Sequence, residues 1–320
     1  MTDVSREAVA IEAGDGHRWQ LLATVPATPG STLLWLPAMG VAAKHYQPFA
    51  DALAARGVAT FVHEWRGNGS SNLRASREQD WGYNELLSRD LPASENAIAA
   101  RFPDTERILG GHSLGGQLAC CRLALTAQDP PAPPTRRLWL VASGSPYWRA
   151  FPAPVRFGLP LAYRFLPWLA DRHGVLPGRR LGFAGQEARG VIRDWARSAI
   201  SGRYAAAGMP IDRGMDPGYL HPGVAGPGDA KPGHTVPEHV DPEHLDLDLD
   251  RAMRRVDADV DAIVMQNDWL APRSSLQYLL SKLGDPGARV AVLDAAALGA
   301  RADHFAWMKQ PERVVDHLVG

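Results

Sequence analysis

The sequence predicts an α/β fold in which a mostly parallel, doubly wound sheet carries an inserted helical cap. Short apolar runs rich in β-forming residues alternate with longer stretches of helical spacing through residues 1–145, and the alternation returns over residues 258–320. It is absent from residues 146–257, which are predicted to form the cap. Because apolar strands separated by helices are typical of a parallel sheet covered on both faces, the two flanking stretches should form one core.

The core elements follow from apolar runs bounded by turn residues and from longer segments with one apolar face. The expected strands are Thr32–Leu36, Val58–Val62, Arg107–Gly110, Leu138–Ala142, Asp261–Met265 and Arg289–Leu293. The expected helices are Tyr46–Arg56, Tyr83–Arg101, Leu114–Ala127, Arg273–Leu283 and a last helix that ends near His317. Gly57 should end the first helix in a left-handed turn, and Pro92, which lacks an N–H, should perturb the second.

The predicted cap is rich in aromatic residues. Residues 147–204 contain 10 of the 25 aromatic side chains in a mostly helical context. More than half of these rings should form a small core of the cap itself. Others should face a ligand, because binding pockets are lined with such side chains. The candidate substrate-binding residues are Tyr147 and Trp148, together with Trp269 of the core.

Within the cap, residues 208–244 are predicted to be a long loop. They contain seven prolines and seven glycines and show no helical or strand period. Four histidines lie here: His221, His234, His239 and His244. Their spacing matches no zinc-binding pattern, so solvated loop histidines are favoured over a metal site.

Composition excludes several classes of protein. Apolar residues make up 45% of the chain and charged residues 22%, which is typical of a globular domain rather than a disordered or fibrous chain. The 34 basic and 35 acidic side chains nearly cancel and form no basic run. Nucleic acid is therefore not an expected partner.

The sequence also predicts a cytoplasmic protein. Cys120 and Cys121 are the only cysteines, and adjacent cysteines cannot form an ordinary disulfide framework. Residues 1–20 are acidic and lack the apolar block of a signal peptide. The most apolar stretch, Val155–Ala170, is interrupted by two arginines and is too short to span a membrane.

A candidate nucleophile lies at the end of the third predicted strand. Gly111-His112-Ser113-Leu114-Gly115 fits the pattern G-x-S-x-G, and it stands between an apolar strand and a helix. Small residues two positions on either side of the serine allow a sharp strand-to-helix turn, which lifts the hydroxyl above the sheet. The N-terminus of the helix then points at developing negative charge.

A serine nucleophile needs a base and an acid that orients the base, and the order to look for is serine, acid, histidine. Asp268 directly follows the strand that ends near Met265, at the same edge of the sheet as Ser113, and is the predicted acid. Asp294, after the next strand, is the fallback. His304, in the loop before the last helix, is the predicted base.

The reaction also needs two main-chain N–H groups that stabilise an oxyanion. One should belong to Leu114, the residue after the nucleophile. The other should come from the loop Pro37-Ala38-Met39-Gly40, which follows the first predicted strand, and Met39 is the candidate.

With these residues in place, the sequence resembles the α/β-hydrolase superfamily. Arg66-Gly67-Asn68-Gly69-Ser70-Ser71 is similar to its R-G-x-G-x-S loop, and Asp268 with Pro272 is similar to its D-x-x-x-P acid loop. Three further segments resemble a largely uncharacterised bacterial subgroup of predicted hydrolases: residues 37–40, 144–149 and 177–182. The resemblance implies an α/β-hydrolase fold. The chain departs from the family where Pro37-Ala38 replaces the usual His-Gly before the second oxyanion donor.

The leading hypothesis is a serine hydrolase that cleaves a carboxylic ester or thioester, with an apolar group, through a covalent acyl-enzyme. The same triad could instead transfer the acyl group to an alcohol or amine, or the chain could be a non-catalytic small-molecule binding protein on this scaffold. A metal hydrolase is the third alternative. No cofactor and no metal are expected, because no glycine-rich phosphate-binding motif follows a strand and the acyl-enzyme chemistry needs neither.

Overall fold

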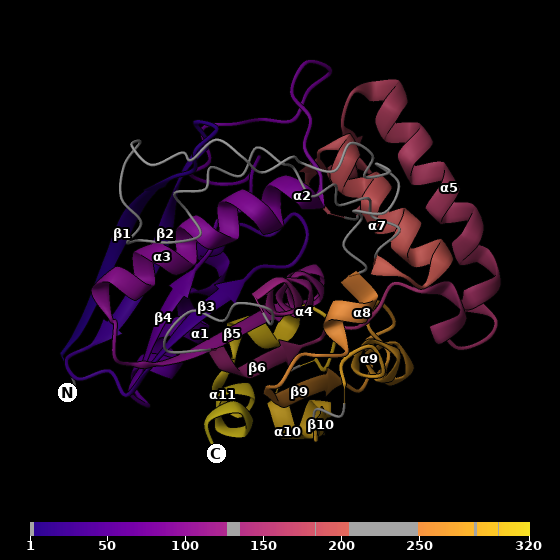
Figure 1. Cartoon of the computed structure of the whole chain (residues 1–320). Coiled ribbons are helices and arrows are strands. Elements are labelled where there is room, and N and C mark those ends of the chain that lie inside the picture. The colour runs from indigo at the N-terminus through magenta and orange to yellow at the C-terminus, as the bar shows by residue number, and fades with distance from the viewer. Residues whose placement is uncertain (1–2, 127–134, 183, 205–248, 285–286, 300) are drawn as a thin grey trace, which may run out of the picture.

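The structure, a computed structural model, describes residues 3–126, 135–182, 184–204, 249–284, 287–299 and 301–320. Within these residues the main sheet has eight strands in the order β1-β2-β4-β3-β5-β6-β9-β10 (Figure 1). They are β1 (Val4–Glu12), β2 (Arg18–Pro26), β3 (Ser31–Leu36), β4 (Val58–Val62), β5 (Glu106–His112), β6 (Thr135–Val141), β9 (Asp259–Met265) and β10 (Arg289–Leu293). The predicted α/β fold with a mostly parallel sheet is confirmed.

One edge of this sheet was not expected from the sequence. Every neighbouring pair from β4 across the sheet to β10 is parallel, whereas β1 pairs antiparallel with β2 and β2 pairs antiparallel with β4. β1 is an edge strand whose side chains are mostly exposed, so it carries little of the apolar pattern that identifies a buried strand. Its structure depends on pairing with β2, which is a tertiary contact.

Helices cover both faces of the sheet. α3 (Leu91–Arg101), α4 (Leu114–Thr126), α8 (Leu249–Met253) and α9 (Arg273–Leu280) pack on one face, in a core that includes Leu109 and Leu140. α1 (Gln47–Ala54), α10 (Ala295–Leu298), α11 (Glu312–Val319) and the 3₁₀ turn η7 (Ala306–Lys309) pack on the other, around Trp35 and Trp139. A second 3₁₀ turn, η1 (Ala43–Tyr46), leads into α1. The sheet is therefore buried between two apolar layers, as a doubly wound fold requires.

The expected helix Tyr83–Arg101 is divided in the structure. A single turn, α2 (Tyr83–Glu85), is followed by a wider π-type turn, η2 (Leu86–Asp90), and then by α3. Pro92 lies in the first turn of α3, where a missing N–H is tolerated. Because the proline ring would clash with a carbonyl one turn earlier, the wider turn accommodates it.

The segment between β6 and β9 begins with helices, as the cap prediction expects. Residues 146–204, here called the cap segment, contain η3 (Trp148–Ala150), α5 (Val155–His173), α6 (Gly178–Leu181), α7 (Arg189–Ser201) and a small hairpin of β7 (Leu176–Pro177) and β8 (Gln186–Glu187). The predicted loop over residues 208–244, with its four histidines, lies outside the described residues. The cap boundaries 146–257 thus stay a prediction. No helix in the described parts of the chain is long and apolar enough to cross a membrane.

Candidate active site

The carboxyl ends of the parallel strands meet along one edge of the sheet, and the loops that follow them are linked to one another. The Ser113 N–H, after β5, donates to Val141 O at 3.2 Å, and the Ala142 N–H, after β6, donates to Ile263 O at 2.9 Å. The Gln266 N–H, after β9, donates in turn to a carbonyl at the end of β10. This edge is where ligands bind in open α/β sheets.

Ser113 occupies the sharp turn between β5 and α4. Its φ of 55° lies in the left-handed region, which a residue with a side chain rarely adopts. A Cβ on Gly111 would collide with the backbone of Gly115, and a Cβ on Gly115 would collide with the carbonyl of Leu36. The Ser143 hydroxyl donates to Ser113 O at 2.7 Å and braces the turn. Both glycines of the pattern are therefore required by close backbone approach, and the left-handed φ at Ser113 is the strained turn expected of the candidate nucleophile.

His304 and Asp268 lie together at the same edge. The His304 Nδ1–H donates to Asp268 Oδ2 at 2.7 Å, and both side chains are almost fully buried. The other carboxylate oxygen of Asp268 accepts the N–H groups of Leu270 and Ala271 at 2.9 and 3.0 Å. A carboxylate held in this way fixes the imidazole with its Nε2 lone pair free to accept a proton.

The histidine also lies next to the turn that carries the serine. Its ring centroid is 4.8 Å from that of His112, the residue that precedes Ser113. We call Ser113, His304 and Asp268 the elbow triad. Its three members come from loops after β5, β9 and β10, so residues up to 191 positions apart in the sequence meet through the sheet.

The loop after β3 is held rigidly beside Ser113. The Trp65 indole N–H donates to Pro37 O at 2.9 Å, and the Ala38 N–H donates to the Tyr46 hydroxyl at 2.9 Å. Among the hydrogen bonds of the described residues, none uses the N–H of Met39 or of Leu114. These two amides are the ones expected to stabilise an oxyanion, and a free N–H is what that role requires.

Tyr46 connects this loop to the nucleophile turn, a link that the sequence analysis did not foresee. Its hydroxyl is also hydrogen-bonded to His112 Nδ1 at 2.9 Å. Burial, and then the nearby His304, lower the pKa of His112 well below its ordinary value, so His112 stays neutral. Tyr46 stands in the predicted helix as an apolar position, and no local pattern distinguishes a ring that only packs from one whose hydroxyl joins two loops.

The family of the chain follows from comparison with models of known protein families. The Hydrolase_4 family model, described as serine aminopeptidase, S33, matches residues 27–189, just over half of the chain. The chain belongs to this family of α/β-hydrolases. It is an α/β-fold hydrolase, as the sequence resemblance predicted. No curated protein sequence matches it.

Solved structures share the fold of this hydrolase along almost its whole length. The esterase domain of a Rhodothermus marinus protein is 14% identical with a TM-score of 0.55, covering 99% of this chain and 100% of that one. An esterase from Exiguobacterium antarcticum is 14% identical with a TM-score of 0.52 and 97% of each chain covered. The thioesterase domain from the curacin biosynthetic pathway is 14% identical with a TM-score of 0.53, covering 98% and 99%.

The predicted substrate-binding residues have different surroundings in the hydrolase. Trp269, next to Asp268, is 66% exposed. Tyr147 packs its ring against Tyr278 at 4.8 Å, and Trp148 packs against the cap cluster around Tyr163. The contacts of Tyr147 and Trp148 hold the cap segment in place, and their role in substrate binding stays a prediction.

Phe305 is an apolar side chain at the site that the sequence analysis did not single out. Its ring lies 4.7 Å from that of His304 and remains 43% exposed. The only signal for it in the sequence is its position directly after the predicted base.

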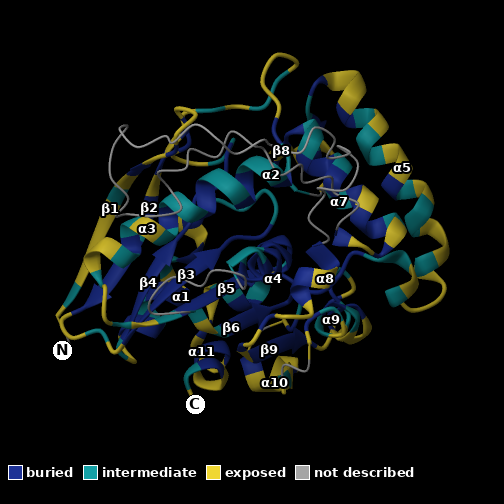
Figure 2. Ribbon diagram, in the orientation of Figure 1, coloured by how far each residue is buried: buried dark blue, intermediate teal, exposed yellow. Residues whose placement is uncertain are grey.

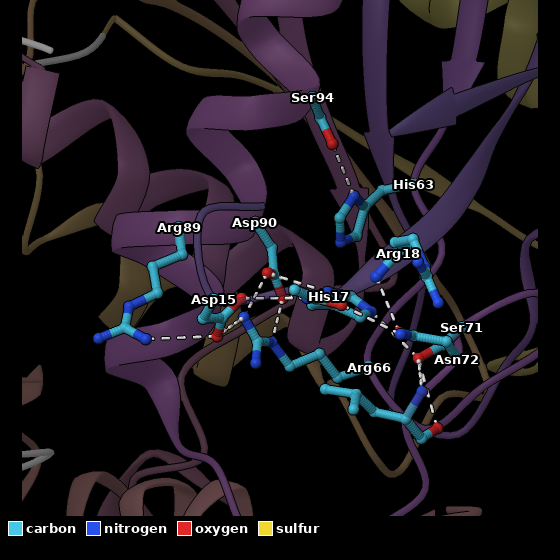
Figure 3. Close-up of polar contacts among 12 residues, drawn as sticks. Asp15, His17, Arg18, His63, Arg66, Ser71, Asn72, Arg89, Asp90 and Ser94 are labelled. Atoms are coloured by element: carbon cyan, nitrogen blue, oxygen red, sulfur yellow. Dashed lines mark hydrogen bonds and ion pairs between the residues drawn. The ribbon is translucent and has the colours of Figure 1, made fainter. Parts of the chain in front are cut away.

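The hydrolase contains a second Ser–His–Asp arrangement, formed by residues that all precede Ser113 in the sequence. His17 Nδ1 is 3.1 Å from Asp90 Oδ1, and His17 Nε2 is 3.0 Å from Ser71 Oγ (Figure 3). We call Ser71, His17 and Asp90 the buried triad, because the side chains of His17 and Asp90 are wholly inaccessible and Ser71 is 4% exposed.

Arg66 closes the buried triad. Its guanidinium holds both oxygens of Asp90 at 2.7 Å and also contacts Asp15 at 2.8 Å (Figure 3). Although burial opposes it, these two carboxylates raise the pKa of Arg66, so the group stays charged. The R-G-x-G-x-S segment noted in the sequence thus ties the β1–β2 turn, through His17, to the turn before α3.

In the described parts of the chain, no three His, Cys, Asp or Glu side chains are grouped so that they could hold a metal ion. The histidines of residues 208–244 lie outside those parts.

Proposed function

We propose that this α/β-hydrolase cleaves carboxylic esters or thioesters through a covalent acyl-enzyme. The observation that carries the proposal is the elbow triad: a serine on a strained turn beside a histidine that an acidic side chain orients at 2.7 Å. Esterase and thioesterase domains with the same fold support this reaction class.

In the first half of the reaction, Ser113 Oγ attacks the carbonyl carbon of the substrate while its proton passes to His304 Nε2. The imidazolium that forms is stabilised by Asp268, which stays ionised and keeps the ring in one orientation. The tetrahedral intermediate collapses, and the alcohol or thiol leaves with the proton that His304 returns. The acyl group remains bonded to Ser113.

The negative charge on the intermediate would be stabilised by the Met39 and Leu114 amides. α4 begins at Leu114, so the positive end of a 13-residue helix points at the same oxygen. Removing one such donor typically lowers turnover by about 10²–10³-fold. The rigid hold on the Pro37–Gly40 loop matters because an oxyanion donor must be in place before the charge develops.

Water completes the cycle. His304 Nε2 takes a proton from a water molecule, whose oxygen attacks the acyl carbonyl. The second tetrahedral intermediate then collapses, releasing the carboxylic acid as Ser113 Oγ regains its proton from His304. The reaction consumes one water and needs no cofactor.

The substrate should carry an apolar group next to the scissile bond. Two large apolar side chains, Trp269 and Phe305, remain exposed directly beside the acid and the base. Aromatic side chains that stay exposed beside candidate catalytic residues are of the kind that lines ligand pockets.

The test is the intact mass of the protein after treatment with a fluorophosphonate, which reacts with activated serines. We expect one adduct on the wild type, none on Ser113→Ala and none on His304→Ala. Ser71→Ala is the matched control, because it removes the serine of the other arrangement, and it should label as the wild type does. A folded wild type that takes no adduct would contradict the proposal and favour a binding protein on this scaffold.

A further inference from the structure

Helix α5 of the cap segment exposes an apolar stripe on its outer face. Phe157, Leu161, Phe165 and Trp168 are 67%, 75%, 46% and 56% exposed. They are spaced four, four and three residues apart, so they lie along one side of the helix. Figure 2 shows exposed residues along α5, which lies at the outer side of the molecule. The solvent side of a surface helix is normally polar, so this stripe needs an explanation.

The inner face of α5 packs against other residues of the cap segment. Leu159 and Tyr163 pack on α7, and the Tyr163 ring lies 4.9 Å from that of Trp195. Further along, Leu166 and Ala170 pack against a second small cluster around Ile192. The outer stripe is therefore a second apolar surface of the same helix and not part of the cap core.

Arginines border the stripe. α5 carries Arg156, Arg164 and Arg172 against a single acidic residue, Asp171, and that carboxylate is paired with Arg193. Two more exposed arginines, at positions 179 and 180, follow in α6. The whole chain has a formal net charge of −1, so the basic character of this surface is local.

We propose that the outer face of α5 docks on an anionic lipid membrane surface. Phenylalanine, leucine and tryptophan side chains would enter the boundary between headgroups and acyl chains, while the arginines reach lipid phosphates at the same level. The helix would lie in the plane of the surface and not cross it. An exposed aromatic stripe rimmed by arginine is the composition typical of interfacial helices.

A second copy of the chain fits this face less well. In a two-fold dimer, α5 would pack on the partner's α5, so each arginine border would face another arginine border. The acidic residue of the helix is already paired, and like charges in contact oppose association. A surface of lipid phosphates offers the opposite charge.

The experiment is co-sedimentation of the full chain with phosphatidylcholine vesicles, with and without phosphatidylglycerol. The Ser113→Ala background removes any hydrolysis, so the result does not depend on the proposed function. We expect binding to vesicles with phosphatidylglycerol that weakens as salt is raised. Leu161→Gln with Phe165→Gln should weaken that binding by about 30-fold.

The charge and the apolar contributions can be separated. Arg164→Gln with Arg172→Gln should weaken binding to vesicles with phosphatidylglycerol by about 30-fold and change binding to phosphatidylcholine alone little. The matched control is Val292→Gln, which removes an apolar side chain that is 45% exposed on β10, and it should bind as the background does. Unchanged melting temperatures of the variants verify folding.

Two outcomes would overturn the proposal. One is a background protein that does not bind vesicles with phosphatidylglycerol at low salt. The other is a dimer in sedimentation velocity that the Leu161→Gln, Phe165→Gln pair dissociates while vesicle binding is absent, which would assign the stripe to a second copy of this chain.

Discussion

The elbow triad and the buried triad contain the same three residue types, and in each the histidine Nδ1 lies within hydrogen-bond distance of the aspartate, at 2.7 and 3.1 Å, yet their surroundings differ at each member. In the elbow triad the acid accepts two backbone amides, whereas in the buried triad Asp90 is clamped by the guanidinium of Arg66. Ser113 lies in a strained turn directly before α4, whereas Ser71 Oγ accepts the N–H groups of Gly67 and Leu73 at 3.2 and 3.1 Å.

The function of a Ser–His–Asp arrangement depends on the groups that surround it. A serine nucleophile needs free backbone amides for an oxyanion, and none of the hydrogen bonds of the described residues uses the N–H of Met39 or of Leu114. The buried triad has its hydrogen bonds satisfied from within the protein, so it stabilises the junction of the β1–β2 turn with the loop after β4 and the turn before α3.

The largest expected effect is the difference in hydrolytic activity between the Ser113→Ala and Ser71→Ala variants. Ser113→Ala should lower kcat for p-nitrophenyl ester hydrolysis by about 10⁶-fold, because the nucleophile is lost. Ser71→Ala should leave kcat/KM within about threefold, because its hydroxyl is enclosed. Steady-state kinetics below the melting temperature measure both, and a comparable loss in Ser71→Ala would remove the distinction between the triads.

Substitution of the two aspartates, Asp268 and Asp90, should change different quantities. Asp268→Asn should lower kcat by about 10⁴-fold with little change in the melting temperature, because the histidine loses its orienting partner. Asp90→Asn should instead lower the free energy of unfolding by about 3–5 kcal/mol, because Arg66 becomes a buried charge with a weakened partner. Urea denaturation and kinetics on each variant decide the case. A stable Asp90→Asn protein with low kcat would contradict it.

The free energy of unfolding should depend on pH through His63, a buried histidine near the buried triad. Its Nδ1 is hydrogen-bonded to Ser94 Oγ at 3.0 Å. Burial lowers the pKa of His63 to about 3. Between pH 3 and 6.5 the unfolded chain therefore binds a proton that the folded chain does not, so stability falls as pH falls through this window. From pH 6.5 to 4 the loss should reach about 3 kcal/mol.

His63→Phe should flatten this acid dependence, and the matched control His45→Gln, at an exposed histidine, should not. Urea midpoints at a series of pH values measure the slope. If His63→Phe kept the full slope, the titrating group would lie elsewhere.

The smallest expected effect tests the link between the oxyanion loop and the nucleophile turn. Tyr46→Phe removes the hydroxyl that accepts the Ala38 N–H and contacts His112. As a positioning residue it should lower kcat by about tenfold with KM unchanged, because the loss is felt in the transition state. Tyr278→Phe, which removes a hydroxyl bonded to the cap segment, is the matched control and should keep the wild-type kcat. A tenfold rise in KM with constant kcat would mean that Tyr46 acts on substrate binding.

Much of the fold was predictable because its strands are local apolar runs. β3, β4, β6 and β9 lie within three residues of the predicted bounds, and β4 matches them, since each strand is largely buried on both faces. The N-terminal hairpin was missed because its outer strand is exposed and polar. The split before α3 was foreseen only as a perturbation at Pro92, since the sequence shows that a proline must be accommodated but not by which turn.

The candidate site divides in the same way. The G-x-S-x-G pattern, the aspartate after a strand and the later histidine could be identified in the sequence, because each is tied to a strand end whose position is local. The link from Tyr46 to His112 and the guanidinium clamp on Asp90 could not, because their partners lie tens of residues away. Phe305 is adjacent to His304 in the sequence, but only the structure shows that its ring stays exposed there.

By itself, the sequence determined the alternation of strands and helices, the turn at Ser113 and the order of the three candidate catalytic residues. These depend on side-chain periodicity and on the space that glycine leaves, which are properties of neighbouring residues. Only the tertiary structure decided that the elbow triad lies near backbone amides without a hydrogen-bond partner among the described residues. It also decided that the aspartate of the buried triad is paired with an arginine. It also decided that α5 has an apolar outer face. Burial and charge pairing are set by residues distant in the chain, and no local pattern contains them.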